Sequence, residues 1–560
     1  MWIGREAAKE LRSTYAPAPS TQRAVTSPSM ESERAEVVTR LRKQLVVECG
    51  ETPPPALAFE RWLLDSLLVE EMSATSKLDK STSTTTTNIT TNTTTTTTTN
   101  TTLNDNSNDP LFGPLCRRTD LESSSLVSDL IRASVLPQDA LLVATNLQTR
   151  ARDMMIAVRR SSTPLKSKKK RMRPTSVSVI FHRHTIDVTF GVKSKRLLKL
   201  NHEHYDKLFS LWRISANGGN NGGNDGGDSD SDLQSGGLTQ AKSGGSSGGK
   251  KKLKSGGTSL VEDQEKAAFH DDLFILLSRY FAMQGHGFQA ACPESVFIVL
   301  HRLLGVSFEC FASPLNCFYG AYCSAFTDVD ASFGSSGSFW NWQPPVEGGS
   351  FQANPPFVAI IMKCMAEKIL DLLVNSEQRE EARFSSSSLT SLSSSSPLSF
   401  VIIVPGWLED EGYRLMSSCQ YIKAHWMIAQ QEHGFCDGAQ HQRRDRYRSS
   451  PYDTAVFVLQ NDAGAAKWPI TRGAATSGGA ANLETELRKA FATGVPTESA
   501  VARRKRDGRG FGDEDGGGGV YKGKKKRRTG EGVVERRRQE SQSKKKKNPK
   551  KKKFKKKKKK

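Results

Sequence analysis

The tetrapeptide Asn354-Pro355-Pro356-Phe357 is the feature that most constrains the fold of this 560-residue chain. It follows a short extended segment, residues 349–353, and opens onto an apolar pattern with helical spacing over residues 358–374. Proline fixes φ and donates no backbone hydrogen bond, so two in succession end an extended segment and suit the first turn of a helix. The sequence therefore predicts a strand, a rigid turn and a helix in that order.

Strand and helix patterns alternate on both sides of this turn. Expected helices cover residues 262–283, 293–304, 358–374 and 421–431, and expected strands cover residues 306–311, 351–353, 400–404 and 454–460. Such alternation is typical of an α/β protein with a parallel sheet. Ligands of these proteins bind beyond the C-terminal ends of the strands, where we expect the functional residues to lie.

Low-complexity tracts divide the rest of the chain. We expect disorder over residues 1–30, a helical domain with a β-hairpin over residues 31–215 that a Thr/Asn-rich insertion (residues 74–109) interrupts, a Gly/Ser-rich linker over residues 216–258, the α/β domain over residues 259–475, and a disordered basic tail over residues 476–560. Hydrophobic residues make up only 36% of the chain because these tracts contain so few. Such tracts cannot bury a core of their own.

Positive charge is concentrated at the C-terminal end. Residues 481–560 carry 30 Lys and Arg against 10 Asp and Glu, which is +20 of the formal net charge of +22. Runs of this kind act as nuclear-import signals or bind polyanions without sequence preference, although a tail that merely aids solubility is the alternative. We therefore expect a nuclear protein that binds nucleic acid.

Cysteine usage and hydropathy exclude several classes of protein. The nine cysteines include no Cys-x-x-Cys pair, and an odd number without an export signal favours reduced thiols in the nucleus or cytosol. No run approaches the roughly 20 apolar residues that span a bilayer, so we expect no membrane partner. We expect no metal site either, because no carboxylate cluster accompanies the histidines at 182, 184, 202 and 204.

The residue types of the tetrapeptide suit methyl transfer to nitrogen. An Asn-Pro-Pro-aromatic turn after a strand is typical of enzymes that methylate an exocyclic or amide nitrogen with S-adenosylmethionine. Such a nitrogen is a poor nucleophile, and the Asn354 side-chain oxygen and the Pro355 carbonyl can accept its two N–H bonds and so aim its lone pair at the methyl group. Phe357 offers a face on which a base can stack. An ordinary proline turn before a helix explains the four residues equally well.

The loop after residues 306–311 is a second candidate for the cofactor site. Its backbone amides, together with Ser313 and Asn316, could bind the amino-acid part of the cofactor, and Glu309 could bind a ribose hydroxyl. The loop has no Gly-x-Gly motif, so this assignment rests on its position after a strand.

The loop after residues 400–404 is a candidate for substrate binding. It contains Trp407, Leu408, Glu409, Asp410 and Glu411. A tryptophan beside carboxylates suits a cationic planar ring such as 7-methylguanine, through stacking and charge. A tryptophan that packs over the edge of the sheet is the alternative.

Several longer motifs resemble those of one known family. They are GVSFECFASPLNC (residues 305–317), YCSAF (322–326), GSFQANPPF (349–357), PLSF (397–400), and LQND (459–462) with AKW (466–468). Over roughly residues 260–470 the chain is similar to the phosphorylated-CTD-interacting factor family, whose members are cap-specific adenosine-N6 methyltransferases. The resemblance implies a Rossmann-like methyltransferase domain behind a mainly helical N-terminal domain.

The resemblance also implies a reaction and a site. The substrate would be capped mRNA whose first nucleotide is 2′-O-methyladenosine, and the product N6,2′-O-dimethyladenosine. Asn354, Pro355, Pro356 and Phe357 carry over as the catalytic and cofactor-binding turn for S-adenosylmethionine, and the Trp407 loop carries over as the segment that contacts the cap.

Two departures from the family leave alternatives open. The family's animal members carry an N-terminal WW module that binds the phosphorylated tail of RNA polymerase II, whereas no tryptophan pair with WW spacing occurs near this N-terminus. Ala359 also stands where the family has an acidic residue. Methylation of internal adenosine or of protein glutamine, and a catalytically inactive RNA-binding scaffold, are the alternative functions.

Overall fold

The computed structural model describes residues 2–15, 26–82, 109–162, 176–191, 197–217, 257–283, 286–384, 396–443, 445–470, 482–499 and 501. All of them lie in the unit Met1–Phe511. Most of the expected Thr/Asn-rich insertion, of the Gly/Ser-rich linker and of the basic tail lies outside these residues.

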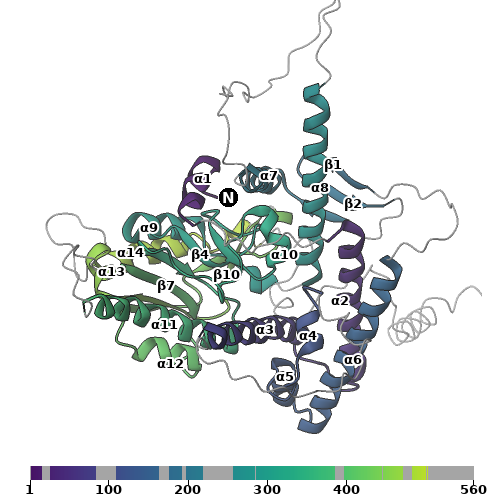
Figure 1. Ribbon diagram of the computed structural model, residues 1–560, viewed down its shortest axis with the longest axis horizontal. Coiled ribbons are helices and arrows are strands. Elements are labelled where there is room, and N and C mark those ends of the chain that lie inside the picture. Colours follow the sequence, from purple (N-terminus) through teal and green to yellow (C-terminus); the bar gives the residue numbers. More distant parts are fainter. Residues whose placement is uncertain are drawn as a thin grey trace, which may run out of the picture. The chain divides into compact units, whose positions relative to one another are not determined.

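A six-stranded sheet is the centre of the C-terminal part of this unit (Figure 1). Its strands are β4 (Phe308–Ala312), β5 (Tyr322–Ser324), β6 (Gly349–Ala353), β7 (Leu398–Pro405), β8 (Ile422–Ile428) and β11 (Thr454–Gln460), in the spatial order β5-β4-β6-β7-β11-β8. The first four in this order pair in parallel, whereas β11 is antiparallel to both β7 and β8. The α/β class is as expected, but the sheet is mixed and not purely parallel.

Strand β7 explains why helices cover both faces of the sheet. All eight of its residues are buried, and successive side chains point to opposite faces. Val401 and Ile403 pack with helices α9 (Glu294–Leu304) and α14 (Leu483–Ala492). Ile402 and Val404 pack on the other face with α11 (Ala359–Phe384) and α12 (Glu411–Ser418).

A second layer of the unit is mainly helical. It contains α2 (Pro28–Glu48), α3 (Ala58–Thr82), α4 (Gly113–Arg117), α5 (Ser125–Arg132), α6 (Pro137–Ser162), α7 (His202–Asn217), α8 (Gly257–Met283) and a small antiparallel sheet of β1 (Val177–Phe181), β2 (Ile186–Phe190) and β3 (Leu198–Leu200). Helix α8 packs against α2 and β1. Its buried Phe269, Leu273 and Phe274 share one core with α2 and α6. The expected domain boundary at residue 259 therefore cuts through a common core.

The expectation of disorder over residues 1–30 is wrong for the described part. Residues Arg5–Thr14 form helix α1, and Arg12 donates hydrogen bonds to the backbone carbonyls of Gly320 (2.6 Å), Leu211 (3.1 Å) and Phe333. Helix α2 then begins at Pro28, with the Ser27 side chain as its N-cap. The apolar residues Ala8, Leu11 and Tyr15 also pack on the protein, but they are few, and the Ser/Thr/Pro-rich composition of residues 1–30 hid them.

Two expectations near the C-terminus are also wrong. Helix α14 lies inside the segment expected to be a disordered tail, and its Leu483, Leu487 and Phe491 are buried at helical spacing. The expected helix over residues 421–431 is strand β8, in which Ala424, Trp426 and Ile428 are buried at alternate positions. Alternation in a short segment is the period of a strand.

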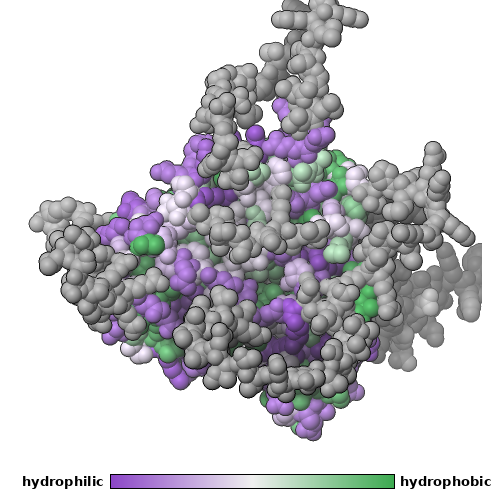
Figure 2. All heavy atoms as spheres, viewed as in Figure 1, coloured by the Kyte–Doolittle hydropathy of each residue, from purple (hydrophilic) through white to green (hydrophobic). Residues whose placement is uncertain are grey.

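Short elements complete the described residues. They are η1 (His286–Gln289), α10 (Thr327–Asp330), η2 (Ala331–Phe333), β9 (Gly434–Cys436), η3 (Gln440–Gln442), β10 (Tyr447–Ser449) and α13 (Asp462–Lys467). On the face in Figure 2, hydrophobic residues appear as small patches between hydrophilic ones. Among the helices described, none combines the length and the apolar character that a membrane span requires.

Candidate functional site at the switch point of the sheet

The strand order of the sheet reverses beside β4, because the chain continues to β5 on one side and to β6 and β7 on the other. Ligands of open α/β sheets bind in the crevice that such a switch point creates beyond the strand ends. A cavity of about 960 Å³, open to solvent, lies there. Residues that follow three parallel strands line it: Ser313 and Asn316 after β4, Phe326 after β5, and Asn354 and Pro356 after β6. Four of these five residues were predicted from the sequence.

Asn354 has one fixed hydrogen bond and one unused acceptor. Its Nδ2 donates to the Ala290 carbonyl at 3.1 Å, and because a carbonyl only accepts, this bond fixes which way the amide is turned. Its Oδ1 is buried and has no hydrogen-bond partner among the described residues. Leaving a buried acceptor unpaired costs about 1–3 kcal/mol, so native proteins rarely do so without a use for it.

The loop after β4 is held by hydrogen bonds among its own residues. Asn316 Oδ1 accepts from the Ser313 backbone N–H (2.7 Å) and from the Ser313 hydroxyl (2.9 Å), and Asn316 Nδ2 donates to the Gln289 carbonyl (3.0 Å). Gln289 also lines the cavity, and its Oε1 is a second buried acceptor without a partner among the described residues. The segment Gln289 and Ala290 therefore fixes both loops, although no motif in the sequence marked it.

The walls of the cavity are apolar and aromatic. Phe288, Phe311, Phe339 and Trp340 line it beside Phe326, so planar ring systems meet aromatic faces there. One wall comes from α3 in the helical layer, through Leu64, Leu67, Leu68 and Glu71. Their spacing puts them on one face of the helix. Sequence reasoning missed this wall because only packing brings α3 to the sheet.

Glu71 is the one carboxylate among the described residues that line the cavity. Burial raises the pKa of this carboxyl to about 7, and a hydrogen bond from the Ser338 hydroxyl opposes the rise. The Ser338 oxygen in turn accepts the backbone N–H of Trp340 at 3.2 Å. Glu71 is therefore connected to the aromatic wall through one serine.

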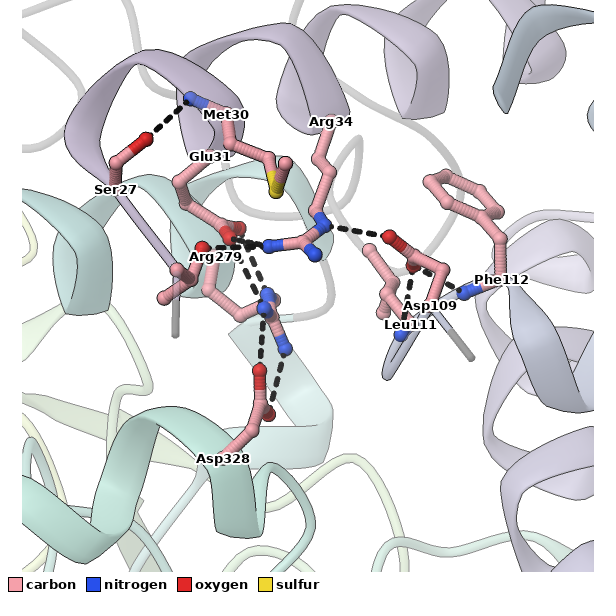
Figure 3. A network of polar contacts seen from close by, with 10 residues as sticks. Ser27, Met30, Glu31, Arg34, Asp109, Leu111, Phe112, Arg279 and Asp328 are labelled. Atoms are coloured by element: carbon pink, nitrogen blue, oxygen red, sulfur yellow. Dashed lines mark hydrogen bonds and ion pairs between the residues drawn. The ribbon is translucent and has the colours of Figure 1, made fainter. Parts of the chain in front are cut away.

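A buried ionic network fixes the helical layer to the loop beyond β5 (Figure 3). The fully buried Arg279 of α8 bonds both oxygens of Glu31 at 2.7 and 2.9 Å and both oxygens of Asp328 at 3.1 and 2.9 Å. Arg34 extends it from Glu31 (3.1 Å) to Asp109 (2.9 Å). Burial works against the charge, but the carboxylates of Glu31 and Asp328 outweigh it and raise the pKa of Arg279.

Phe357 and Trp407 lie outside the cavity lining. Their ring centroids are 6.5 Å apart, and the Trp407 ring meets Tyr452 edge to face at 5.5 Å. Pro355 is buried in the turn and is likewise absent from the lining, whereas Pro356 lines the cavity. The tetrapeptide therefore has one end in the cavity and the other beside a partly exposed aromatic group, Phe357, Trp407 and Tyr452.

The polar side chains of the Trp407 loop already have partners within the protein. Glu409 pairs with Arg414, and Glu411 pairs with Lys363 at 2.7 Å. Asp410 caps α12 by accepting the Tyr413 N–H at 3.2 Å, and burial raises the pKa of this carboxyl. Leu408 is exposed. The structure thus brings these residues together on one loop but gives the carboxylates local structural contacts.

Glu309 is the sequence-predicted residue whose surroundings fit its expected role least. Its Oε1 accepts the backbone N–H groups of Phe318 (2.7 Å) and Tyr319 (3.0 Å), and the side chain does not line the cavity. Burial raises the pKa of Glu309 to about 7 despite these two bonds. The contacts give it a role in shaping the loop that follows β4.

The fold and the cavity define a class of protein: an open α/β sheet with a cavity at its switch point and an unpaired amide acceptor, Asn354 Oδ1, in the lining of that cavity. Residues 252–438 match the family model described as "Phosphorylated CTD interacting factor 1 WW domain". Within residues 252–438, the described elements run from α8 to β9 and include most strands of the large sheet. The match therefore does not correspond to a small separate WW module.

Two curated relatives name an activity. The mRNA (2′-O-methyladenosine-N(6)-)-methyltransferases of Homo sapiens and Mus musculus are each 37% identical to this chain over 223 residues. The aligned part is 38% of this chain and spans 29% of each relative's length. The family resemblance seen in the sequence is thus confirmed for this part of the chain.

Proposed function

We propose that this chain is an S-adenosylmethionine-dependent methyltransferase that acts on N6 of the 2′-O-methyladenosine next to the cap of mRNA. The observation that carries the proposal is the buried, unpaired Oδ1 of Asn354 at the switch point. The order of the parallel strands supports a Rossmann-like domain around it. The names of the human and mouse relatives support the same substrate.

The residues of the cavity fit S-adenosylmethionine. The cavity is concave and mainly apolar, as small-molecule sites are, and its aromatic wall suits the adenine ring. Ser313, Asn316 and Gln289 surround the polar part of the cavity and would hold the amino-acid end. When bound, the cofactor supplies an electrophilic methyl group on its sulfonium.

The turn after β6 then acts on the target nitrogen. Asn354 Oδ1 accepts one N–H of the adenine amino group, and the Pro355 carbonyl accepts the other. Both bonds are stronger to the pyramidal nitrogen of the transition state than to the flat nitrogen of the free base. They therefore lower the barrier to methyl transfer. Ala290 keeps the amide from turning its Nδ2 towards the base.

Selectivity for the cap is assigned to the aromatic group outside the cavity. Phe357 offers a face for the adenine, and Trp407 and Tyr452 offer faces for the cationic 7-methylguanine. The Lys-rich tail adds affinity for RNA without sequence preference and directs the protein to the nucleus. Contact with the phosphorylated tail of RNA polymerase II is suggested only by the description of the family model.

Methylation of matched RNAs tests the proposal. The full chain is incubated with labelled S-adenosylmethionine and four RNAs, capped or uncapped, that begin with 2′-O-methyladenosine or with guanosine. Labelled N6,2′-O-dimethyladenosine from the capped adenosine RNA is the expected product. Label in internal adenosine or in protein glutamine would favour the alternative substrates, and RNA binding without methylation would favour an inactive scaffold. Microscopy of a tagged chain with and without residues 501–560 tests nuclear import.

A further inference from the structure

The end of strand β5 lacks an available acidic residue. In dinucleotide-binding sheets, an acidic residue near the end of the second strand binds a ribose hydroxyl. Here residues 322–326 contain no carboxylate. The next two along the chain are engaged elsewhere, because Asp328 is paired with Arg279 and Asp330 accepts the Tyr280 hydroxyl at 2.6 Å.

A carboxylate reaches this place from the helical layer instead. Ser324, the last residue of β5, donates its backbone N–H to the Gly337 carbonyl at 2.9 Å, so the segment that contains Ser338 lies against the strand end. The Ser338 hydroxyl donates to Glu71 of α3. Glu71, Ser324 and Ser338 all line the cavity.

We propose that Glu71 is the group that binds the ribose hydroxyls of the nucleoside ligand in this cavity. The assignment rests on the proposed function for the identity of that ligand. A carboxylate offers about four lone-pair sites, so a bond from Ser338 is compatible with accepting two vicinal hydroxyls. The ligand would then extend from Asn316 and Asn354 at the switch point towards β5, with its sugar against α3.

Neighbouring residues make the assignment specific to one side chain. Glu70 is adjacent in sequence, but it pairs with Arg117 on α4 and does not line the cavity. Leu64, Leu67 and Leu68 share the face of Glu71 and supply apolar contacts, so they offer no acceptor for a hydroxyl. Glu70 is therefore a matched control for charge and position on the helix.

Calorimetric titration of the full chain tests the role without relying on turnover. The probes are S-adenosylhomocysteine and its 2′-deoxy analogue, and the proteins are wild type, Glu71→Ala, Glu71→Gln and Glu70→Gln. At pH 8, where most of Glu71 is ionised, wild type should bind the deoxy analogue about tenfold more weakly or worse, as expected for a lost hydrogen bond to a charged group. Glu71→Ala should bind S-adenosylhomocysteine at least about tenfold more weakly and distinguish the two probes by less than about twofold.

The two other variants separate ligand contact from a purely structural role. Glu71→Gln keeps the side-chain volume and the bond from Ser338, so it should fold as wild type does and still lose most of the preference for ribose. Glu70→Gln should match wild type. If both Glu71 variants keep the wild-type preference for ribose, Glu71 does not bind the hydroxyls and the assignment is overturned. If wild type binds neither probe, the proposed function itself fails.

Discussion

The cavity and the Trp407 loop lie at opposite ends of the same tetrapeptide, and they differ in how their polar groups are used. In the cavity, Asn354 Oδ1 and Gln289 Oε1 are buried without partners among the described residues. In the loop, Glu409, Asp410 and Glu411 all have partners within the protein. Unused buried acceptors indicate a place prepared for a ligand, whereas paired surface carboxylates indicate local stability. The comparison favours the cavity as the site of chemistry.

Substitution in the ionic network that supports the cavity should change the free energy of unfolding more than any other substitution considered. Arg279→Met leaves Glu31 and Asp328 buried beside each other without their shared cation, so we expect a loss of about 3–5 kcal/mol in the free energy of unfolding. Urea denaturation measures it. Arg302→Met removes an exposed pair with Glu486 and should leave the unfolding midpoint almost unchanged. Equal midpoints for both variants would contradict a supporting role for the network.

Removal of the unused acceptor should affect the reaction more than the fold. Asn354→Ala deletes one of the two proposed acceptors, and kcat should fall about 10²–10³-fold while S-adenosylhomocysteine still binds. Single-turnover methylation of capped RNA measures it. Asn354→Asp tests the orientation, because a carboxylate cannot donate to the Ala290 carbonyl. A near wild-type rate for Asn354→Ala would place the chemistry elsewhere.

Glu309 lies beside the cavity but outside its lining, and its effect should appear in the pH dependence of stability. The folded protein raises the pKa of Glu309 from 4.5 to about 7, so its stabilising contribution is complete below 4.5 and is lost as pH rises through 7. Glu309→Gln retains an acceptor for Phe318 and Tyr319 without ionising. Between pH 4.5 and 7, the free energy of unfolding of Glu309→Gln should rise by about 1–3 kcal/mol relative to that of wild type. Urea denaturation at several pH values would show parallel curves if this is wrong.

Loss of the loop's aromatic face should change selectivity and little else. Trp407→Ala should lower the preference for capped over uncapped RNA by about 1–2 kcal/mol, the range of a cation–π contact. The two kcat/KM values, compared in wild type and variant, measure this preference. Trp407→Phe should keep part of it. An equal fall for both RNAs would make Trp407 a packing residue against Tyr452.

The smallest effect is expected for the loop's paired carboxylate. Glu411→Gln weakens an exposed contact with Lys363, so the unfolding midpoint should hardly move. Use of capped RNA should change by less than about twofold, because this carboxylate is already occupied. Thermal denaturation and kcat/KM for the capped substrate measure both. A large fall in kcat/KM for capped RNA alone would show that Glu411 contacts the cap. It would also weaken the distinction between the cavity and the Trp407 loop.

Local patterns predicted much of the fold and four residues of the cavity lining. Strands β7 and β11 were predictable because their long apolar runs suit strands buried on both faces. Ser313, Asn316, Asn354 and Pro356 were predictable because residues that follow parallel strands meet at one edge of the sheet. Strand β8 was mistaken for a helix, since its apolar residues fit both periods over so short a segment.

The rest of the site depends on packing between distant segments. The α3 wall and the segment of Gln289 and Ala290 carry ordinary helix and turn residues, and nothing near them in the sequence indicates a ligand. Arg12 shows the same limit, because its three carbonyl partners lie about 200 or more residues away and only the fold brings them to α1. Contacts of this kind become visible only when the chain is folded.

The position of α3 links ligand binding to the integrity of the whole unit. The cavity is complete only while the helical layer stays packed on the sheet, because Leu64, Leu68 and Glu71 are part of its wall. A ligand that binds only when the two layers are packed together stabilises that packing. By thermodynamic linkage, the free energy by which the ligand favours the packing equals the free energy by which the packing favours ligand binding. The bound nucleoside would then contact both layers and raise the free energy of unfolding of the whole unit. The protein would be most resistant to unfolding when its ligand is bound.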